Sequence, residues 1–269
     1  MANEVFVCYW IGEYQSPLPT PNTIPARATI VPFAFIGIQP DYTLGFGDVT
    51  AVYPQAQLQQ WIDELRARGT KVLLSVLGSR LGTVPADQVD TLVGAIVDAV
   101  QNWKVDGVDL DYEPPSADSS FGLVVQRLRS ALPSAILTLP VYDAWLFGCQ
   151  DLLKQVAPYL DYVTTMDYSP YPGYDQTIAR CKQYAALIGG WSKLVIGVCC
   201  MNPANSKFTP IGDVATFAKY EPKGGVMLYT FPYDLQKRMI KQNGQPVQTG
   251  TQLPDQKFTD TIIANLPRT

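Results

Sequence analysis

The chain has 269 residues, of which 47% are hydrophobic and 11% aromatic. This length and composition are typical of a packed globular protein with one or two domains, and they are usual for a single α/β barrel. No uninterrupted apolar run approaches the roughly 20 residues of a membrane-spanning helix, which argues against a membrane protein. The formal net charge of −4 comes without a basic stripe. Nucleic acid and anionic membrane surfaces are therefore disfavoured as partners, and a neutral ligand fits better.

The sequence contains no histidine. This absence removes Ser-His-Asp and Cys-His nucleophiles and every histidine-ligated metal site, so any chemistry must use carboxylates, hydroxyls or thiols. The five cysteines have no C-x-x-C spacing, and their odd number leaves at least one unpaired in a monomer. We expect all of them to be small buried side chains, at Cys8, Cys149, Cys181, Cys199 and Cys200.

Short β-branched or aromatic runs alternate with segments of helical period along the chain. The runs predict eight strands, at 4–11, 28–38, 71–78, 105–113, 135–142, 162–168, 194–201 and 224–231. Apolar residues at helical spacing predict one helix around Leu58, Trp61, Ile62 and Leu65, and another around Val89, Leu92, Val93, Ile96, Val97 and Val100. Weaker helical patterns cover about 119–132, 144–157, 174–189, 210–220 and 255–266.

This alternation predicts a parallel sheet covered by helices, because most of the strands are too apolar to have a solvated face. At this length the sheet closes most naturally as a single (β/α)8 TIM barrel, with a doubly wound open sheet as the alternative. Residues 12–27 contain four prolines and no helical period, so the first helix should be missing or reduced to a turn. The short segment 202–223 leaves no room for an α+β insertion between the seventh and eighth strands.

No repeat, low-complexity tract or linker divides the chain, so we expect one domain over residues 1–269. The segment 243–254, after the eighth strand, is irregular in pattern and is predicted to be a loop. The chain opens directly on a strand-like run, without a charged and then apolar leader. Either the protein is not exported by a leader, or the leader has been removed from this sequence.

The fourth predicted strand carries a cluster of acids in the stretch VDGVDLDYEPP. A strand period of two sends Asp109, Asp111 and Glu113 to one face, and in a central barrel strand that face is the interior. The alternative, the solvated face of an edge strand, does not suit a central position. Asp109 and Asp111 cannot comfortably both ionise there, so we expect them to share a proton. Asp106 has the opposite parity and precedes Gly107, which indicates a supporting role near the start of the strand.

Residues 106–113 read D-G-V-D-L-D-Y-E and resemble the D-G-x-D-x-D-x-E signature of family 18 glycoside hydrolases, which include chitinases and endo-β-N-acetylglucosaminidases. The resemblance extends over nearly the whole chain. VCYWIG at the first strand and GGVMLY at the eighth look like plant class III chitinases, LLSVLG resembles the S-x-G-G motif of the third strand, and TMDYS resembles the M-x-Y-D motif of the sixth. Three positions depart from the pattern, with Leu77 for glycine, Ser169 for Asp or Asn, and Tyr229 for Trp.

The resemblance implies a site at the carboxyl end of the barrel and a substrate-assisted mechanism that uses no cofactor and no metal. Its implied catalytic residues are Glu113 as general acid and base, Asp111, Asp109 and Tyr168. The residues implied to bind substrate are Tyr9, Phe35, Ser75, Gly78, Tyr142, Met166 and Tyr229. The Ser169 departure removes a group that helps to hold the substrate's acetamido group, whereas Tyr229 can still stack on a sugar face.

On this resemblance we expect an endo-acting chitinase with an open groove, whose partner is chitin or another N-acetylglucosamine-containing oligosaccharide. One alternative is an endo-β-N-acetylglucosaminidase that cuts N-glycans, and the other is a non-catalytic chitin-binding lectin. We expect a monomer that is secreted and acts outside the cell, with a cytoplasmic location or leaderless export as the alternatives. A phosphate-binding barrel would need a glycine-rich anion loop after the seventh or eighth strand, and CCMNPANSKF is not one.

Overall fold

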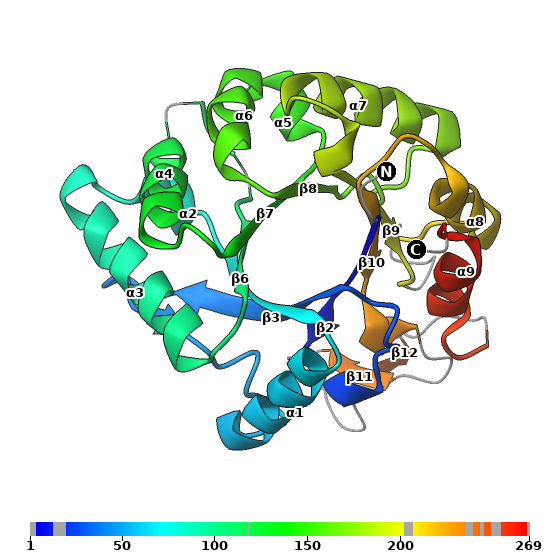
Figure 1. Cartoon of the computed structure of the whole chain (residues 1–269), viewed down its shortest axis with the longest axis horizontal. Helices are drawn as coiled ribbons and strands as arrows, with labels where there is room; N and C mark the ends of the chain where they lie inside the picture. The colour runs from blue at the N-terminus through cyan, green and yellow to red at the C-terminus, as the bar shows by residue number, and fades with distance from the viewer. Residues whose placement is uncertain are drawn as a thin grey trace.

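Eight parallel strands form a closed barrel in this computed structural model. The structure describes residues 4–12, 20–113, 115–117, 119–201, 207–234, 239–242, 245–248 and 254–267. Within them, the barrel strands are β1 (Val5–Cys8), β3 (Ile30–Ile38), β5 (Lys71–Leu77), β6 (Gly107–Asp111), β7 (Ile136–Val141), β8 (Tyr162–Thr165), β9 (Leu194–Cys199) and β10 (Gly225–Tyr229). Each strand pairs with its neighbours in this order, and the pairings of β1 with β3 and with β10 close the barrel (Figure 1). The prediction of a (β/α)8 barrel is confirmed.

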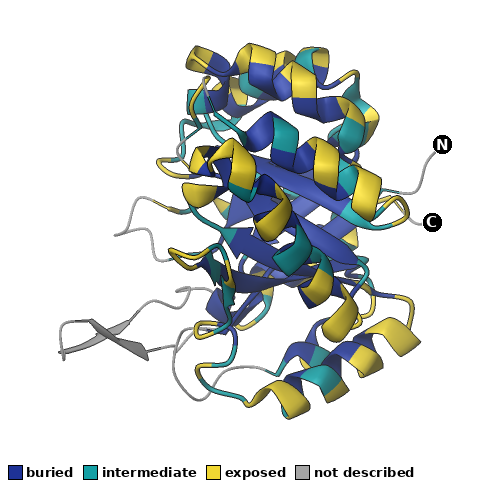
Figure 2. Ribbon diagram, turned by 90° about the vertical axis from the view of Figure 1, so that its left-hand side faces the viewer, coloured by how far each residue is buried: buried dark blue, intermediate teal, exposed yellow. Residues whose placement is uncertain are grey.

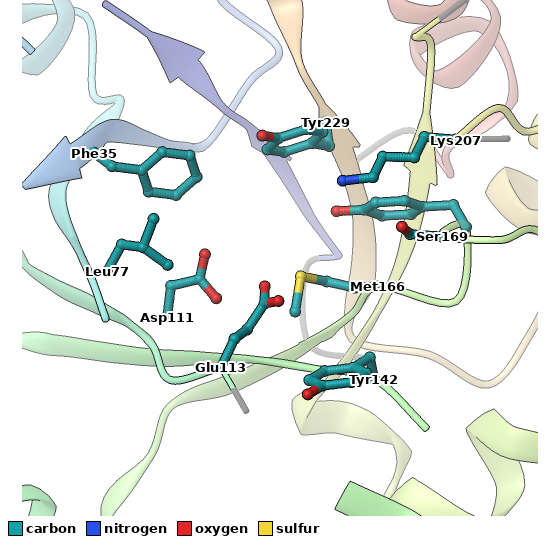
Figure 3. Close-up of a pocket in the computed structure, with 10 residues that line it drawn as sticks. Phe35, Leu77, Asp111, Glu113, Tyr142, Met166, Ser169, Lys207 and Tyr229 are labelled. Atoms are coloured by element: carbon teal, nitrogen blue, oxygen red, sulfur yellow. The ribbon is translucent and has the colours of Figure 1, made fainter. Parts of the chain in front are cut away.

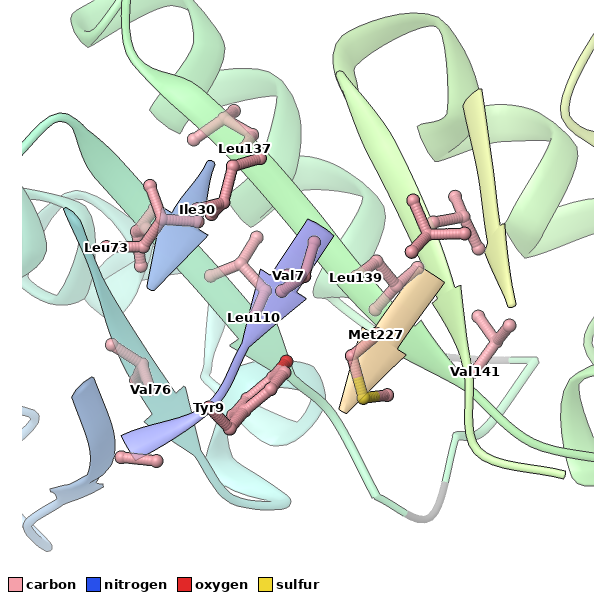
Figure 4. Close-up of a cluster of buried hydrophobic side chains, with 14 of the residues drawn as sticks. Val7, Tyr9, Ile30, Leu73, Val76, Leu110, Leu137, Leu139, Val141 and Met227 are labelled. Carbon is pink, nitrogen blue, oxygen red and sulfur yellow. The ribbon is translucent and has the colours of Figure 1, made fainter. Parts of the chain in front are cut away.

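The barrel strands are buried on both faces, as expected of a parallel sheet under helices. Every residue of β1, β6 and β9 is buried. Apolar side chains such as Leu110, Leu139 and Met227 are at most 1% exposed and belong to one continuous core (Figure 4). Each strand lies inside one of the segments predicted from sequence. The continuous burial explains why short apolar runs located these strands.

Helices surround the barrel as an outer ring (Figure 1). The described helices are α1 (Gln55–Ala67), α2 (Arg80–Thr83), α3 (Val89–Asn102), α4 (Phe121–Ala131), α5 (Ala144–Phe147), α6 (Gln150–Val156), α7 (Tyr174–Leu187), α8 (Ile211–Lys219) and α9 (Lys257–Asn265). They turn buried faces to the strands and exposed faces to solvent (Figure 2). In α1 the buried residues are the four predicted ones, Leu58, Trp61, Ile62 and Leu65.

The connection between the first two barrel strands has no α-helix among its described residues. After β2 (Trp10–Ile11), which pairs with β3, the described part contains the 3-10 turn η1 (Pro21–Thr23), with Pro21 at its start. Residues 13–19 of the predicted proline-rich segment lie outside the described residues. The predicted helix over 144–157 is divided into α5 and α6 at Gly148, a residue that is unfavourable inside a helix.

Other connections follow the predictions or correct them. Between β9 and β10 the described residues contain α8 and an isolated bridge from Cys200 to Phe208, with no α+β insertion. The prediction of a loop over 243–254 is wrong in part, because β12 (Gln245–Gln248) pairs antiparallel with β11 (Met239–Gln242). The Asn-Gly dipeptide between them in the sequence is a strong hairpin signal that the loop prediction overlooked.

All five cysteines are free and buried, as predicted. Burial raises the pKa of the Cys8 thiol and that of the Cys200 thiol well above their usual range, which keeps them protonated and unreactive. Among the described helices, none combines the length and the hydropathy needed to cross a membrane.

A buried carboxylate fastens the last helix to the end of the barrel. Asp234 follows the 3-10 turn η6 (Phe231–Tyr233) after β10 and is completely buried. Its Oδ1 accepts the backbone N–H of Phe258 at 3.1 Å, and its Oδ2 accepts that of Thr259 at 2.8 Å. Both N–H groups belong to the first turn of α9, where a helix lacks internal partners. Asp234 therefore caps α9 from a distant part of the chain.

Replacing Asp234 with alanine should lower the free energy of unfolding by about 1–3 kcal/mol, because two buried N–H groups of α9 lose their acceptor. Asp234→Asn keeps one acceptor oxygen and should lose less. Urea unfolding followed by far-UV circular dichroism measures both variants against the wild type. An alanine variant as stable as the wild type would show that α9 does not depend on this contact.

Candidate active site

Asp109 lies in an interior row of the barrel. The strand register places Ser75 of β5, Asp109 of β6 and Thr138 of β7 side by side, and residues in one row of a parallel sheet point to the same face. Asp109 is completely buried. The hydroxyls of Ser75 and Tyr9 each donate to its Oδ2 at 2.7 Å, and the hydroxyl of Thr138 donates to its Oδ1. Hydroxyl donors thus occupy both oxygens of this carboxylate.

Asp111, the next interior residue of β6, differs from Asp109 in its surroundings. It is 4% exposed, and its Oδ1 has no hydrogen-bond partner among the described residues. Burial raises the pKa of Asp111 well above its usual range, and the charges of Glu113 and Asp109 raise it further. A side-chain hydrogen bond with Glu113 acts in the same direction. Asp111 therefore holds its proton more tightly than an exposed aspartate does.

Glu113 and Asp109 both raise the pKa of Asp111, and Glu113 has the larger effect of the two. Burial raises the pKa of Asp109 too, but its three hydroxyl hydrogen bonds oppose that rise. The charge of Glu113 acts on the pKa of Asp111 more strongly than that of Asp109 does, and Glu113 also supplies the hydrogen bond. The sequence predicted sharing between Asp109 and Asp111. In the structure Glu113 is the stronger neighbour of Asp111, because the three hydroxyl groups already form hydrogen bonds with Asp109.

Glu113 lies beyond the end of its strand. β6 ends at Asp111, and the backbone N–H of Tyr112 turns back to the carbonyl of Leu110 at 3.0 Å. The parity of the strand predicted the direction of Glu113 but not this early end. Glu113 is exposed and its carboxylate points into the pocket above Asp111 (Figure 3). A carboxyl group in this position can reach a ligand and still contact the buried acid behind it.

Two tyrosine rings form one wall of the pocket. The rings of Tyr168 and Tyr229 stack with centroids 5.9 Å apart and planes 15° apart, and the edge of Tyr9 meets Tyr229 at 6.0 Å. Tyr168 is 3% exposed and comes from the segment that follows β8. Burial raises the pKa of Tyr168 well above its usual range, so its phenol stays protonated and can donate a hydrogen bond.

The carboxyl ends of the strands surround a pocket of about 280 Å³ (Figure 3). Its lining is aromatic and apolar with a few charged or polar groups: Phe35, Leu77, Asp111, Glu113, Tyr142, Met166, Tyr168, Ser169, Lys207 and Tyr229. A mixed lining of rings, acids and hydroxyls is what a sugar requires, because its ring faces are apolar and its edges are polar. The arrangement provides one reachable acid, a second acid behind it, a phenol, and rings on which a sugar can stack.

Most of the predicted site residues line this pocket, and the others support it from below. Tyr9 and Ser75 are at most 2% exposed and contact Asp109, so their observed contacts are with the carboxylate and not with the cavity. Gly78 follows β5 with φ of +144°, a conformation that favours glycine, and its N–H donates to the carbonyl of Asp111 at 3.1 Å. These three residues hold the acids in place.

Asp106 is the fourth acid of the cluster and lies outside the barrel interior. Its Oδ2 accepts the backbone N–H of Val72 at 3.0 Å and the Nε–H of Arg66 at 3.1 Å, and Lys71 lies 3.2 Å from its Oδ1. These partners belong to α1 and to the start of β5. The supporting role predicted from its parity agrees with these contacts.

Two residues of the site were not predicted from the sequence. Thr138 donates to Asp109 from the neighbouring strand, and only the register between strands, which a single sequence does not reveal, makes this contact visible. Lys207 lines the pocket from the segment between β9 and α8. Its one available signal was a lone basic residue shortly after the seventh predicted strand. Among the described residues, no three potential metal ligands of the His, Cys, Asp or Glu type come together.

An arginine behind the pocket joins two of the segments that line it. Arg180 of α7 donates from Nη1 to Asp167 Oδ1 at 2.9 Å and from Nη2 to Asp143 Oδ2 at 3.4 Å. Asp143 follows Tyr142 at the end of β7, and Asp167 lies between Met166 and Tyr168. Asp167 is buried, its Oδ2 has no hydrogen-bond partner among the described residues, and burial raises its pKa to about 6 despite Arg180.

Comparison with known proteins adds independent evidence. The model of the family described as glycosyl hydrolases family 18 matches residues 5–230. A GH18 chitinase from Pseudoalteromonas aurantia has 19% sequence identity and a TM-score of 0.70, over 97% of this chain and 99% of that chain. A Group IV chitinase from Ostrinia furnacalis has 14% identity and a TM-score of 0.72, over 98% of this chain and 100% of that one.

YKL-39, solved in the presence of chitooligosaccharides, has 13% identity and a TM-score of 0.75, over 98% of this chain and 100% of that chain. At these levels of identity, the likeness to the three solved structures shows a shared fold.

The buried carboxyl group of Asp167 should make stability depend on pH. The folded pKa of Asp167, about 6, lies above the ordinary value of 3.8, so the folded protein holds the proton more tightly than the unfolded chain does. The resulting stability is fully present below about pH 4 and is lost as the pH rises through about 6. Between pH 4 and 8 the wild type should therefore lose up to about 3 kcal/mol relative to Asp167→Asn, which cannot titrate. Urea unfolding at a series of pH values measures this difference, and a difference that stays constant with pH contradicts the prediction.

Proposed function

The chain belongs to glycosyl hydrolase family 18, and we propose that it hydrolyses β-1,4-linked N-acetylglucosamine polymers as an endo-acting chitinase. One observation carries the proposal, namely the reachable carboxyl of Glu113 beside the buried acid Asp111 inside an aromatic pocket (Figure 3). The names of the similar solved structures from Pseudoalteromonas aurantia and Ostrinia furnacalis support the same activity.

Glu113 is the proposed general acid. Its exposed carboxyl faces the cavity, where it can protonate the oxygen of a glycosidic bond, and it can then activate the water that completes hydrolysis. Asp111 supports both steps, because it can give hydrogen-bonding support to Glu113 when that residue is charged and release it when it is protonated. Asp109 remains fixed by its three hydroxyl partners.

The nucleophile is proposed to be the substrate's own N-acetyl oxygen. A retaining glycosidase with an enzymatic nucleophile needs two carboxyl groups about 5–5.5 Å apart. The two acids that line the pocket, Asp111 and Glu113, lie side by side at the end of β6, and we assign neither of them as the nucleophile (Figure 3). In the proposed reaction the acetamido N–H donates to Asp111, the phenol of Tyr168 orients the acetyl carbonyl, and its oxygen attacks the anomeric carbon with overall retention.

The open form of the site favours cleavage within a polymer. The described residues between β9 and β10 contain only the helix α8 as a regular element, so no inserted domain stands over the pocket. A long chain can then cross the carboxyl ends of the strands without threading an end. Since an insoluble polymer is met outside cells, the proposed activity also implies a secreted enzyme, which we propose acts as a single-domain monomer.

Glu113→Gln should lower kcat on a chromogenic N-acetylglucosamine oligosaccharide at least about 100-fold, because the amide cannot donate the proton to the leaving group. The substitution is isosteric and its site is exposed, so the thermal midpoint of unfolding should stay close to that of the wild type. Asp111→Asn should also lower kcat, because Glu113 loses its partner for proton sharing.

Product analysis on a β-1,4-linked N-acetylglucosamine hexamer, beside an N-glycoprotein, separates the alternatives. Internal cleavage of the hexamer with retained anomeric configuration is the expected result. Release of glycan from the glycoprotein, without cleavage of the hexamer, would establish an endo-β-N-acetylglucosaminidase instead. A wild type that binds the hexamer and never cleaves it would establish a lectin.

A further inference from the structure

The charges of the pocket are divided between two sides. Asp111 and Glu113 enter from the side of β6, whereas the side chain of Lys207 reaches into the cavity beside Tyr229 and Ser169 (Figure 3). Ser169 brings a hydroxyl to the side of Lys207 and no charge that could neutralise it. The cavity thus has an acidic side where the proton transfer is proposed and a cationic side across from it.

The backbone that carries Lys207 is tied to the end of β9. The thiol of Cys199 donates to the carbonyl of Lys207 at 3.1 Å. Two residues later, the N–H of Thr209 donates to the carbonyl of Cys199 at 2.9 Å, and the hydroxyl of Thr209 accepts the N–H of Cys199 at 3.1 Å. Cys199 and Thr209 are completely buried at the end of a barrel strand. They fix the point from which the Lys207 side chain enters the pocket.

The ammonium of Lys207 has no carboxylate of a described residue within ion-pair distance. Its positive charge lowers the pKa of Asp111, but as the last of the causes, behind burial and the neighbouring carboxylates. Lys207 is exposed, so in the empty pocket water can solvate its charge. A ligand that covers the pocket removes that water, and an ammonium that loses water without gaining a counter-charge costs free energy.

We infer that the pocket binds N-acetylglucosamine oligosaccharides that carry a carboxylate, and that Lys207 pairs with this carboxylate. A neutral hydroxyl can accept a hydrogen bond from the ammonium but leaves its charge uncompensated, whereas a carboxylate compensates it and forms the stronger charge-assisted bond. The side of the pocket that holds Asp111 and Glu113 offers a carboxylate no positive charge, so the acidic group of the sugar must face Lys207. The inference rests on the proposed function in so far as the pocket takes an N-acetylated sugar.

Binding to the Glu113→Gln protein tests this inference without turnover. The probes are a short β-1,4-linked N-acetylglucosamine oligosaccharide oxidised to a carboxylate at C6, and one that bears a 3-O-lactyl carboxylate, each beside its own uncharged carboxamide. At least one carboxylate should bind roughly tenfold more tightly than its carboxamide, as expected for a charge-assisted hydrogen bond. The probe that shows the preference identifies the position at which the sugar carries its carboxylate. Isothermal titration calorimetry measures the ratio, and added salt should reduce it.

Second substitutions in the same background assign the preference to Lys207. Lys207→Met should bring the ratio of affinities close to one, and Lys207→Arg should retain it. Lys219→Met removes the same charge from an exposed position of α8 outside the pocket lining and should leave the ratio as it was. A ratio near one in the Glu113→Gln parent, or a preference that survives Lys207→Met, overturns the inference.

The two proposals fail in different ways. If the Glu113→Gln protein binds the neutral and acidic probes equally while the wild type cleaves the neutral polymer, the charge preference is refuted and the chitinase stands. If binding is selective and Lys207-dependent but the wild type cleaves none of the probes, the preference stands and the proposed hydrolysis is refuted. If none of the N-acetylated probes binds, both proposals are refuted.

Discussion

The structure depends on a carboxylate that is buried completely and held by hydroxyl groups. Moving an unpaired charge into a protein interior is costly, and Asp109 meets this cost with donors from Tyr9, Ser75 and Thr138. Those donors come from different parts of the barrel, and they reach one carboxylate only when β5, β6 and β7 have their observed register. A shift of one residue in β6 would turn Asp109 toward the helices and Leu110 toward the hydroxyls. The hydrogen bonds that Asp109 needs in the interior can therefore form only if β5, β6 and β7 pair in this register.

Asp109, Asp111 and Glu113 lie at successive depths along β6 and the residues after it, and each has a different environment. Asp109 has hydroxyl donors on both oxygens, Asp111 is nearly as buried with an unpartnered oxygen, and Glu113 reaches the open pocket. Because solvation falls and fixed donors become available with depth, the deepest acid is anchored, the middle one tends to keep its proton, and the outermost can reach a ligand. β6 and the residues directly after it thus place three acids in line at three depths.

Apolar runs predicted the barrel strands, and alternating acids predicted which side chains face the barrel interior. Strand segments were found because a covered parallel sheet needs continuous apolar residues, and the inward direction of Asp109 and Asp111 followed from a period of two. The end of β6 at Asp111 was not predictable in this way, because the backbone turn of Tyr112 leaves the periodic pattern unchanged. Thr138 and Lys207 were missed for a related reason: their roles depend on which segments become neighbours, a property of the closed barrel and not of any local run of residues.

The wall and floor of the pocket are fixed by polar contacts, whereas the side chains at its opening are exposed. The proposed chemistry can use this difference. Behind its wall, Arg180 joins Asp143 and Asp167, so the segments that carry Tyr142 and Tyr168 are linked by charged contacts. Below its floor, hydroxyls fix Asp109. By contrast, Glu113 and Lys207 are exposed at the opening and can adjust their side chains to a ligand. A sugar would then meet fixed rings and the buried acid Asp111 at the depth where its N-acetyl group must be oriented. At the opening the sugar would meet the exposed side chains of Glu113 and Lys207. There, in the proposed function, a proton is transferred and a variable substituent of the sugar is bound.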